Sequence, residues 1–378
     1  QFGEGGAGTF SDGKLTSRVR NPLVGWVKKT LVEMGAPASI MTDGKPHIGT
    51  DRLRHVLVNF RNRLMAAGGE VRFGAKVTDI LSRNHKVVGV VVNGGQEIQT
   101  DCLILAIGQS ADDTYELLHA RHIQLEPKPF AIGLRIEHPQ DRIDGVQYGR
   151  WAGNPLLPPA EYFLSATIKE LNRSIYTFCM CPGGRVIGSS SRAGGVVTNG
   201  MSDSRRDGLY ANSAMVVNIR PEDFFADKNH PLAGLAFRRE WEETAYVLGG
   251  RDYWAPAERV VDFLLDKESP DVGETTFQPG VRAAPLHQVL PPFVGEALKL
   301  GLKVFQRKMP GFVSREAHFI GVETRTSSPV RITRRPDGQS ASLSGVYPCG
   351  EGAGYAGGII SSALDGIRAA QQAMEDYR

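Results

Sequence analysis

Residues 344–374 read SGVYPCGEGAGYAGGIISSALDGIRAAQQAM, which joins a short apolar run, a cluster of glycines and a periodic tail. The apolar run predicts a short strand over residues 344–350. The glycines at 352–357 match the pattern G-x-G-x-x-G of dinucleotide-binding turns. The tail predicts a helix whose apolar stripe is formed by Ile360, Leu364, Ile367 and Met374. A strand, glycine loop and helix in this order indicate an α/β domain.

A second match to the same pattern, GEGGAG at residues 3–8, lies at the other end of the sequence. A dinucleotide-binding turn needs a buried strand before it, an amphipathic helix after it, and an acidic residue about 20 residues further on. Only Gln1 and Phe2 precede this match, and the polar residues after it carry an Asp-Gly turn signal without a helical stripe. No second strand or ribose-binding acid follows the match at 352–357. Neither match completes the fingerprint, and we interpret residues 3–13 as a glycine-rich loop.

The composition is that of an ordinary soluble protein, with 41% hydrophobic and 22% charged residues and a net charge of +3. Basic pairs are scattered, which argues against a nucleic-acid partner, and no apolar run reaches the ~18 residues of a membrane span. The four cysteines form no C-x-x-C pair, and the known metal, P-loop and serine-hydrolase signatures are absent. We therefore expect a cytoplasmic protein without a metal site or a membrane partner, of unknown oligomeric state.

The first third of the sequence predicts one strong helix and several short strands. The helix covers residues 50–67, with Thr50 as N-cap and Gly68 and Gly69 as its stop. Its predicted apolar stripe consists of Leu53, Leu57, Phe60 and Leu64. Strands are expected at residues 70–73, 76–81, 86–92 and 96–99. The continuous apolar run at 103–107 predicts a parallel strand that is fully buried.

From about residue 121 the pattern changes. Residues 128–139 alternate apolar residues with Arg135 and Glu137, which predicts a strand with one exposed face. Residues 174–191 predict two strands joined by a Pro-Gly-Gly turn, and helices are expected at 231–250 and 291–309. Because strands precede helices without βαβ alternation, we expect an α+β domain at residues 121–334. It is inserted into a split α/β domain, residues 1–120 and 335–378.

The order of glycine loop, β-meander, strand ending in LILAIG, and strand–GEGAGYAGG–helix resembles the glutathione-reductase-like FAD-binding fold. The strings FGEGGAGTFSDGKL, PHIGTDRL, YTFCMCPGG, NGMS, GVETRTSSPVRI and YPCGEGAGYAGGI are similar to a bacterial group of uncharacterised FAD-dependent dehydrogenases. Members begin with a βαβ unit upstream of the FGEGGAG loop. The resemblance therefore implies an incomplete FAD/NAD(P)-binding Rossmann-like domain, made of a parallel sheet plus a β-meander. We expect these 378 residues to bind FAD weakly or not at all.

The resemblance also implies which residues would contact FAD. These are Gly5, Gly6, Ala7, Gly8, Thr9, Asp12, Lys14, Val77, Ala106, Gly108, Gly350, Glu351, Gly357, Gly358 and Ile359. Glu351 would accept hydrogen bonds from the ribityl chain, and the helix that opens at the last glycines would direct its positive end toward the reduced flavin. The first two assignments have structural alternatives, in which the loop is a turn and Glu351 caps a helix. Val77 and Ala106 are expected to be core residues whether or not they lie near the cofactor.

Three residues are candidates for catalysis: Arg325, Cys179 and Cys181. Arg325 faces either an anionic substrate or an acidic partner such as Glu323. The C-x-C pair on a strand places both thiols on one face, which fits redox chemistry or ordinary packing. We expect an FAD-dependent oxidoreductase that moves a hydride or electrons between the flavin and a small-molecule substrate, with NAD(P)H as a candidate donor. The alternatives are a binding or regulatory module without turnover, and a chain unable to hold FAD.

Overall fold

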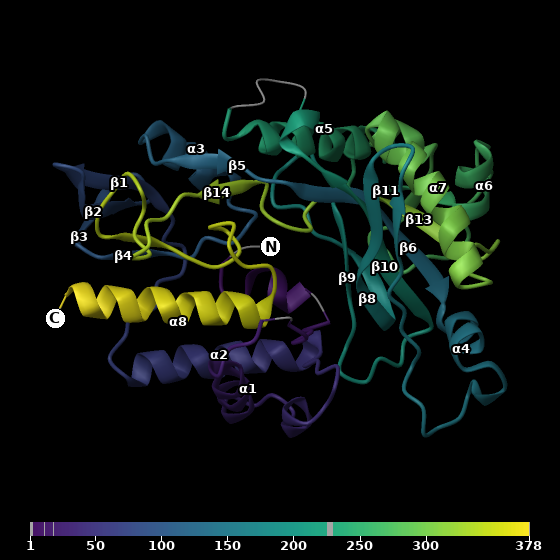
Figure 1. Cartoon of the computed structure of the whole chain (residues 1–378), viewed down its shortest axis with the longest axis horizontal. Helices are drawn as coiled ribbons and strands as arrows, with labels where there is room; N and C mark the ends of the chain where they lie inside the picture. The colour runs from purple at the N-terminus through teal and green to yellow at the C-terminus, as the bar shows by residue number, and fades with distance from the viewer. Residues whose placement is uncertain (1–2, 11, 18, 225–229, 378) are drawn as a thin grey trace.

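The computed structural model describes residues 3–10, 12–17, 19–224 and 230–377. Figure 1 shows two parts side by side: a smaller part around the long helix α8 and a larger part around a broad sheet. Parallel and antiparallel strands and helices occur together. The predicted α/β fold class, with a parallel strand pair, a meander and an α+β region, is confirmed.

The smaller part contains a β-meander and a parallel strand pair. The meander runs β1-β2-β3, and β15 pairs in parallel with β4, so that the end of the chain returns beside residues 103–105. Its strands are β1 (Val77–Arg83), β2 (Lys86–Val92), β3 (Gln96–Gln99), β4 (Leu103–Leu105) and β15 (Val346–Pro348). Its helices are α1 (Leu23–Glu33), α2 (Thr50–Ala66), α3 (Asp112–Ala120) and α8 (Ile359–Asp376).

The larger part is built on an eight-stranded sheet in the order β12-β11-β13-β6-β10-β8-β7, with β9 paired to β8. Its strands are β6 (Phe130–Pro139), β7 (Ser165–Ile168), β8 (Arg173–Gly188), β9 (Thr198–Met201), β10 (Tyr210–Ile219), β11 (Ala255–Arg259), β12 (Val281–Ala283) and β13 (His318–Glu323). Its helices are α4 (Gln140–Tyr148), α5 (Ala233–Leu248), α6 (Val260–Leu265) and α7 (Pro292–Lys308). Short 3₁₀ helices are η2 (Ala38–Met41), η3 (Gly149–Trp151), η4 (Pro221–Asp223) and η5 (Leu286–Val289).

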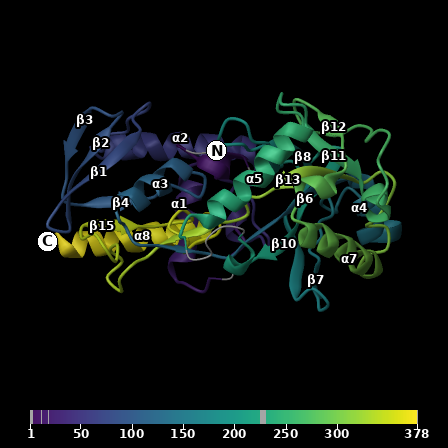
Figure 2. The ribbon, with the colours of Figure 1, turned by 90° about the horizontal axis from the view of Figure 1, so that it is seen from above.

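The chain passes between the two parts at an antiparallel pair, β5 (Leu125–Pro127) and β14 (Val330–Ile332). Helix α5 spans the same junction, as Figure 2 shows, because it gives Leu235 to the core of the smaller part and Phe237 to that of the larger part. The predicted domain limits, 1–120 with 335–378 and 121–334, stay a prediction.

Most predicted elements with a strong periodic pattern form where expected. The strands at 76–81, 86–92 and 96–99 are present, as are the helices at 50–67, 231–250, 291–309 and after residue 357. No strand forms at residues 70–73, so that prediction is wrong. No helix among the described residues is both long and apolar enough to cross a bilayer.

The predicted faces of two helices need correction. Gly49, not Thr50, is the N-cap of α2, and the Thr50 hydroxyl donates to the Thr9 carbonyl. Of the predicted stripe, Leu53 is buried but Leu64 is 52% exposed, because α2 packs mainly through its first half. In α8, Met374 is 60% exposed and Ala373 takes the buried position.

The prediction that β6 has an exposed polar face is wrong. Arg135 and Glu137 are both fully buried. Strand β9 and a bend in β8 cover this face, and Gly200 of β9 lies so close that a Cβ there would collide with the Arg135 guanidinium. The polar half of the alternating pattern therefore forms a buried network.

Residues 174–191 also differ from the prediction of two strands. Residues 173–188 form one strand, β8, and Pro182-Gly183-Gly184 is a bend inside it. Cys179 and Gly183 both have positive φ, 47° and 49°, and the register of β8 with β10 shifts here. Glycine is required at 183, since a Cβ would collide with the Arg206 carbonyl.

The LILAIG strand is parallel as predicted, but its predicted burial is wrong. Leu105 is buried, whereas Ile104 is 42% exposed. The reason is that β4 has only β15 as its neighbour in a two-stranded sheet among the described residues.

Candidate functional site

The first glycine-rich segment forms a short 3₁₀ helix, η1 (Gly6–Phe10), which includes Ala7 and Gly8 and packs on α2. The Thr9 amide donates to the Gly5 carbonyl, and the Thr9 hydroxyl donates to the Gly6 carbonyl at 3.0 Å. At Gly5, with φ 82°, a Cβ would lie 2.5 Å from the side chain of Leu57. Gly5 therefore permits close packing on α2, as the structural alternative for this loop anticipated.

Two charged residues follow this turn. Asp12 is fully buried, and its carboxylate accepts from the Arg206 guanidinium, with Nε at 3.2 Å. Lys14 Nζ lies 3.7 Å from the same carboxylate and stays partly exposed. Because Arg206 follows β9, Asp12 ties the glycine turn to the larger part of the molecule.

The second glycine loop contacts the turn that follows β4. A Cβ at Gly352 would lie 2.5 Å from the Gly108 carbonyl oxygen, so the two backbones touch. Tyr115 of α3 stabilises this contact, because its hydroxyl donates a hydrogen bond to the Gly352 carbonyl at 2.7 Å. Burial raises the pKa of Tyr115 to about 12, which keeps the hydroxyl protonated as a donor. Two segments far apart in sequence, both predicted to contact FAD, thus form one surface.

Four glycines on this surface leave open space where a side chain would stand. No atom lies within 4 Å of a Cβ placed at Gly108 or Gly357, and single side-chain atoms lie at 4.0 Å for Gly350 and Gly358. Gly358 is the N-cap of the 18-residue helix α8, whose first residue is the half-buried Ile359. Open glycines beside a helix N-terminus allow another molecule to approach the backbone and the positive end of the helix.

Two further predicted contact residues, Val77 and Ala106, are both exposed. The expectation that they are core residues is therefore wrong. Ala106 lies two residues before Gly108, whereas Val77 begins β1 of the meander. Their contact with FAD stays a prediction.

Cys179 and Cys181 lie at the bend in β8, and Lys14 and Glu351 interact electrostatically with Cys179. Cys179 is half-buried and Cys181 is fully buried. The left-handed backbone of Cys179 breaks the strand alternation. The Cys181 thiol donates to the Cys179 carbonyl at 3.3 Å. The sequence predicts both thiols on one face of a strand, and the bend instead brings the Cys181 sulfur against the backbone of Cys179.

The side chain of Arg135 contacts both cysteines. Its guanidinium donates to the Cys179 carbonyl at 2.7 Å and lies 3.6 Å from the Cys181 sulfur. The remaining nitrogens donate to Asn212 Oδ1 at 2.9 Å and to Glu323 Oε1 at 3.2 Å. A buried arginine with these four partners places a fixed positive charge beside the sulfurs.

Glu351, on the second glycine loop, is an acidic residue that interacts electrostatically with Cys179 and Lys128. Burial raises the pKa of its carboxyl to about 7; Lys128 opposes the shift, whereas Cys179 adds to it. Glu351 and Cys179 are thus electrostatic neighbours, although they come from different parts of the molecule. A carboxyl that titrates near neutral pH can hold or release a proton at this position.

The surroundings of Cys179 favour its thiolate. The Cys181 thiol, by hydrogen bonding, lowers the pKa of Cys179 to about 5; burial opposes this, and Lys14 and Arg135 assist it against Asp12. Glu323 and Glu351 are the other acids electrostatically coupled to this thiol. Cys181 is the hydrogen-bonded partner whose pKa is raised.

We expect Cys179 to react with iodoacetamide at a rate that is nearly constant from pH 8 down to pH 6 and falls only toward about pH 5. Cys102 is the control, because burial raises the pKa of its thiol. Its alkylation should fall throughout the same range, from pH 8 down to pH 6, because its thiol is mostly protonated there. Site-resolved mass spectrometry of the alkylated chain measures both profiles. Parallel profiles for the two cysteines would contradict the expected thiolate.

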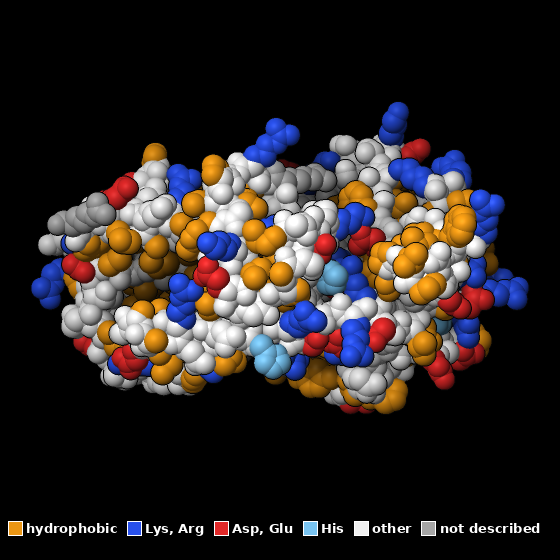
Figure 3. All heavy atoms as spheres, turned by 90° about the horizontal axis from the view of Figure 1, so that it is seen from below, with side chains coloured by type: hydrophobic (Ala, Val, Ile, Leu, Met, Phe, Trp, Pro, Cys, Tyr) orange, Lys and Arg blue, Asp and Glu red, His pale blue; other side chains and the backbone are white. Residues whose placement is uncertain are grey.

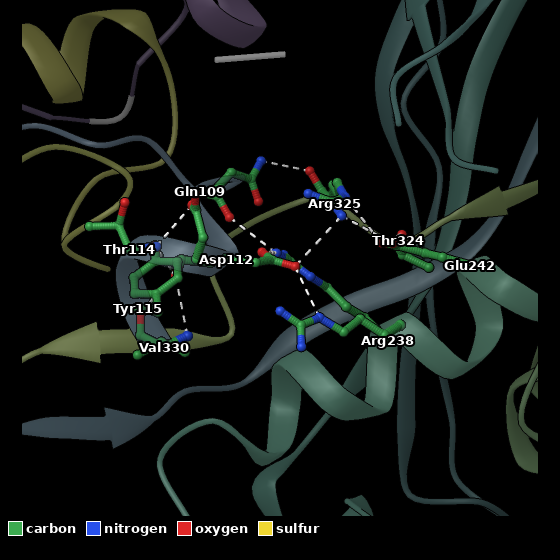
Figure 4. Close-up of polar contacts among 12 residues, drawn as sticks. Gln109, Asp112, Thr114, Tyr115, Arg238, Glu242, Thr324, Arg325 and Val330 are labelled. Atoms are coloured by element: carbon green, nitrogen blue, oxygen red, sulfur yellow. Dashed lines mark hydrogen bonds and ion pairs between the residues drawn. The ribbon is translucent and has the colours of Figure 1, made fainter. Parts of the chain in front are cut away.

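Arg325 lies in a separate ion-pair network at the junction, shown in Figure 4. Its Nε and Nη2 donate to the two oxygens of Glu242 at 3.0 and 2.8 Å. Its carbonyl accepts from Gln109 Nε2 at 2.7 Å, just after the turn at Gly108. The acidic partner is therefore Glu242, whereas Glu323 pairs with Arg135. An anion-binding role for Arg325 stays a prediction.

The same network joins the turn after β4 to α5. Asp112 accepts from the fully buried Arg238 and lies 3.3 Å from Arg239 Nε. Figure 4 shows Arg238 and Arg325 approaching Asp112 from opposite sides. This arrangement holds the predicted FAD-contacting turn against the larger part.

Sequence reasoning missed Arg135, Tyr115 and Lys128 as parts of the site. Arg135 was placed on an exposed face, and the other two carry no motif that distinguishes them. Arg135 and Tyr115 contact Cys179 and Gly352, and Lys128 donates to the Ser328 carbonyl, all distant in sequence, so no local pattern reveals them.

Two open hollows and a surface of mixed charge lie elsewhere on the described residues. Hollows of about 520 and 470 Å³ lie along α5 and beside residues 188–197, away from the thiol pair and the second glycine loop. On the face seen in Figure 3, Lys and Arg side chains are interspersed with Asp, Glu and apolar ones.

Comparison with known proteins gives one family match and one close relative. Residues 129–326 match the family described as "FAD-dependent protein, C-terminal domain-like". An uncharacterized protein of Clostridium beijerinckii is 45% identical over 379 residues, an alignment that covers 100% of this chain and 70% of that protein.

Solved structures give weaker similarities. Glycine oxidase from Bacillus cereus is 11% identical with a TM-score of 0.35, covering 88% of this chain and 57% of the other. An oxidoreductase from Methanosarcina mazei is 12% identical with a TM-score of 0.36 and coverages of 90% and 58%. Amadoriase I from Aspergillus fumigatus is 12% identical with a TM-score of 0.35 and coverages of 92% and 58%. This chain thus spans less than two thirds of the length of these solved chains. Because the TM-scores are below 0.5, these similarities support no conclusion about the site.

Proposed function

This chain belongs to the family of FAD-dependent proteins with that C-terminal domain-like region, and we propose that it carries much of an FAD-dependent oxidoreductase. We further propose that it falls into the glutathione-reductase-like class. The observation that carries the proposal is the surface where the Gly108 and Gly352 backbones meet beside the N-terminus of α8.

The residues on this surface fit a planar, partly anionic cofactor. Gly108, Gly350, Gly357 and Gly358 leave room for a ring or phosphate to reach the backbone. The positive end of α8 stabilises negative charge brought next to Gly358. FAD, when bound, would supply hydride or two-electron chemistry.

The surrounding side chains would bind and orient the substrate. Lys14 and Lys128 provide positive charge, and Glu351 can accept or give a proton near neutral pH. Cys179 is a half-buried thiol that interacts electrostatically with Lys14 and Glu351. We propose that a small-molecule substrate binds between the predicted FAD surface and the bend in β8, with NAD(P)H as a candidate electron donor.

Reduction of the bound flavin tests this function. The full natural protein that contains this chain is loaded with FAD and mixed without oxygen with NADH, NADPH and a panel of small metabolites. Bleaching of the flavin absorbance by one of them is the expected result. Photoreduction with a chemical donor is the control for a reducible flavin. Flavin that is photoreduced but accepts electrons from no compound of the panel would favour a binding or regulatory module.

The behaviour of the 378 residues alone is a separate prediction. Titration of this chain with FAD, followed by quenching of flavin fluorescence, is expected to show weak binding or none. Tight equimolar binding would contradict this expectation and leave the proposed oxidoreductase function unaffected.

A further inference from the structure

A hollow of about 470 Å³ lies at the C-terminal end of β8, apart from the proposed flavin surface. Three segments that are distant in sequence form its walls: the loop at residues 188–197, Tyr253, and residues 277–279. Its volume lies within the roughly 300–1,000 Å³ of small-ligand sites. The hollow along α5, in contrast, is lined by residues of that one helix. A depression built from three segments is therefore the stronger candidate for a binding site.

The loop at residues 188–197 is held in place by hydrogen bonds. The Ser190 hydroxyl donates to a backbone carbonyl of the loop at 2.7 Å and accepts from a backbone amide at 3.2 Å. The Val196 amide donates to the Glu242 carbonyl at 2.9 Å, which ties the loop to α5. Gly194 turns the chain with φ 76°, and no atom lies within 4 Å of a Cβ placed there. The loop backbone is thus fixed and open to the approach of another molecule.

The other two walls carry aromatic rings and are also held in place. The Tyr253 hydroxyl accepts from the Gly194 amide at 3.2 Å, while the residue stays 42% exposed. Phe277 is buried and follows Thr276, whose amide donates to Glu137 Oε2 at 3.1 Å. The walls are therefore positioned by the fold itself, and one of them presents an exposed aromatic residue.

Arg192 brings a positive charge to this hollow. Its side chain is 50% exposed, and Nη1 lies 3.6 Å from a carboxylate oxygen of Glu243, which is 56% exposed. An ion pair that is this open to solvent is weak, so the guanidinium can turn to a bound anion. Gln278, which also lines the hollow, adds an amide that can donate and accept hydrogen bonds. A ligand with a planar ring, hydroxyl groups and an anion matches these groups.

We propose that this hollow binds a nucleoside phosphate. The base stacks on the ring of Tyr253, and the phosphate accepts charge-assisted hydrogen bonds from the Arg192 guanidinium. Gln278 is the amide available to the hydroxyls of the sugar. Binding is noncovalent and does not require the flavin. Two sources offer this chemistry: a free nucleotide, and the adenosine end of a dinucleotide donor such as NADPH.

Calorimetric titration with ADP, adenosine and NADPH tests the site. The full natural protein is titrated without added flavin, and again after loading with FAD and removal of the excess. We expect the loaded protein to bind one equivalent of ADP, roughly tenfold or more tighter than adenosine, which lacks the anion for Arg192. Binding of neither ADP nor NADPH would overturn the site. Loss of all ADP binding upon FAD loading would also overturn it, because the nucleotide would then occupy the flavin surface.

Two substitutions locate the binding. Arg192→Gln is expected to weaken ADP binding roughly tenfold and to leave adenosine binding unchanged. The matched control is Arg185→Gln: Arg185 is 47% exposed and lies 3.5 Å from Asp203, but it does not line the hollow. Its ADP affinity should equal that of wild type. Tyr253→Leu should weaken ADP and adenosine alike, whereas Tyr253→Phe keeps the ring and should bind both nearly as wild type does.

Equal ADP affinity in wild type and in folded Arg192→Gln would overturn the assignment, and circular dichroism checks that the variants are folded. Protein that takes up no FAD but binds ADP through Arg192 contradicts the flavin function and supports this site. Protein that holds reducible FAD but binds neither nucleotide contradicts this site alone. Where ADP or NADPH binding depends on Arg192, tighter binding of NADPH identifies the dinucleotide donor, and binding of ADP at least as tight identifies a free nucleotide.

Discussion

Replacing Arg135 with methionine is expected to lower the free energy of unfolding by about 3–5 kcal/mol, because one partner of a buried ion pair is removed. Glu323 would keep a buried carboxylate without its cation, and the Cys179 carbonyl and Asn212 Oδ1 would lose a donor. Methionine has a similar length and no charge, so the packing volume changes little. Urea unfolding followed by circular dichroism measures the difference.

The difference in unfolding free energy between wild type and the Arg135→Met variant should also depend on pH. Burial raises the pKa of Glu323 to about 7 even with Arg135 beside it to oppose the shift. Without Arg135 the folded state holds this proton still more strongly than the unfolded state does. Stability therefore falls in wild type and variant alike as pH rises from the ordinary carboxyl pKa of about 4.3 toward about 7, and above about 7 it continues to fall only in the variant, so the difference between the two grows there. A pH-independent difference from wild type would contradict the role given to Glu323.

Two further variants serve as controls for Arg135. Arg72→Ala removes an exposed, solvent-screened pair with Glu70 and should leave the free energy of unfolding almost unchanged. Adding Glu323→Leu to Arg135→Met should recover part of the loss, because no unpaired charge remains. If Arg135→Met costs no more than Arg72→Ala, the buried network does not stabilise the bend.

Replacing Gly352 with alanine is expected to weaken FAD binding by roughly 10- to 100-fold, as overpacking that costs about 1–3 kcal/mol implies. The new Cβ would lie 2.5 Å from the Gly108 carbonyl oxygen and push the two loops apart. Gly352 does not have a positive φ, so the effect is steric and not conformational. Fluorescence titration of the full protein with FAD measures it.

The matched control is Gly366→Ala in the middle of α8. No atom lies within 4 Å of a Cβ at this position outside the helix itself. Alanine should leave the FAD affinity unchanged and raise stability by up to about 1 kcal/mol, because it is the better helix former. Unaltered FAD affinity in Gly352→Ala would show that the contact between the loops does not form the binding surface.

Elements with a local signal were predictable from the sequence. The helix at α7 and the strand at β2 have clear apolar periodicity bounded by turn residues, and both form. The glycine loop between β15 and α8 was located from its flanks. In these cases neighbouring residues determine the structure, so periodicity and turn chemistry suffice.

Burial and partner choice were not predictable, because they depend on distant segments. Arg135 lies on the polar side of an alternating strand, and only β9 and the bend in β8 show that this side is covered. Arg325 finds its acid in Glu242, on a helix 83 residues away, and not in the nearby Glu323. The positive φ of Cys179 has no sequence signal, since residues with a Cβ rarely adopt it.

The same limit applies to the candidate site. The sequence named Glu351, Lys14 and the C-x-C pair separately, through resemblance or residue type. Their proximity follows from the contact of the Gly352 loop with Gly108 and from the Asp12–Arg206 pair that ties the first glycine turn to the larger part. Local patterns therefore indicated the components, and the tertiary structure assembled them.

The measurement that tests the central claim most directly is the FAD content of the full natural protein. The purified protein is denatured, and the released cofactor is identified by mass and quantified by its absorbance. We expect an equimolar amount of FAD, or uptake of an equimolar amount after incubation with added FAD. A purified, folded protein that neither carries flavin nor takes it up would contradict the account.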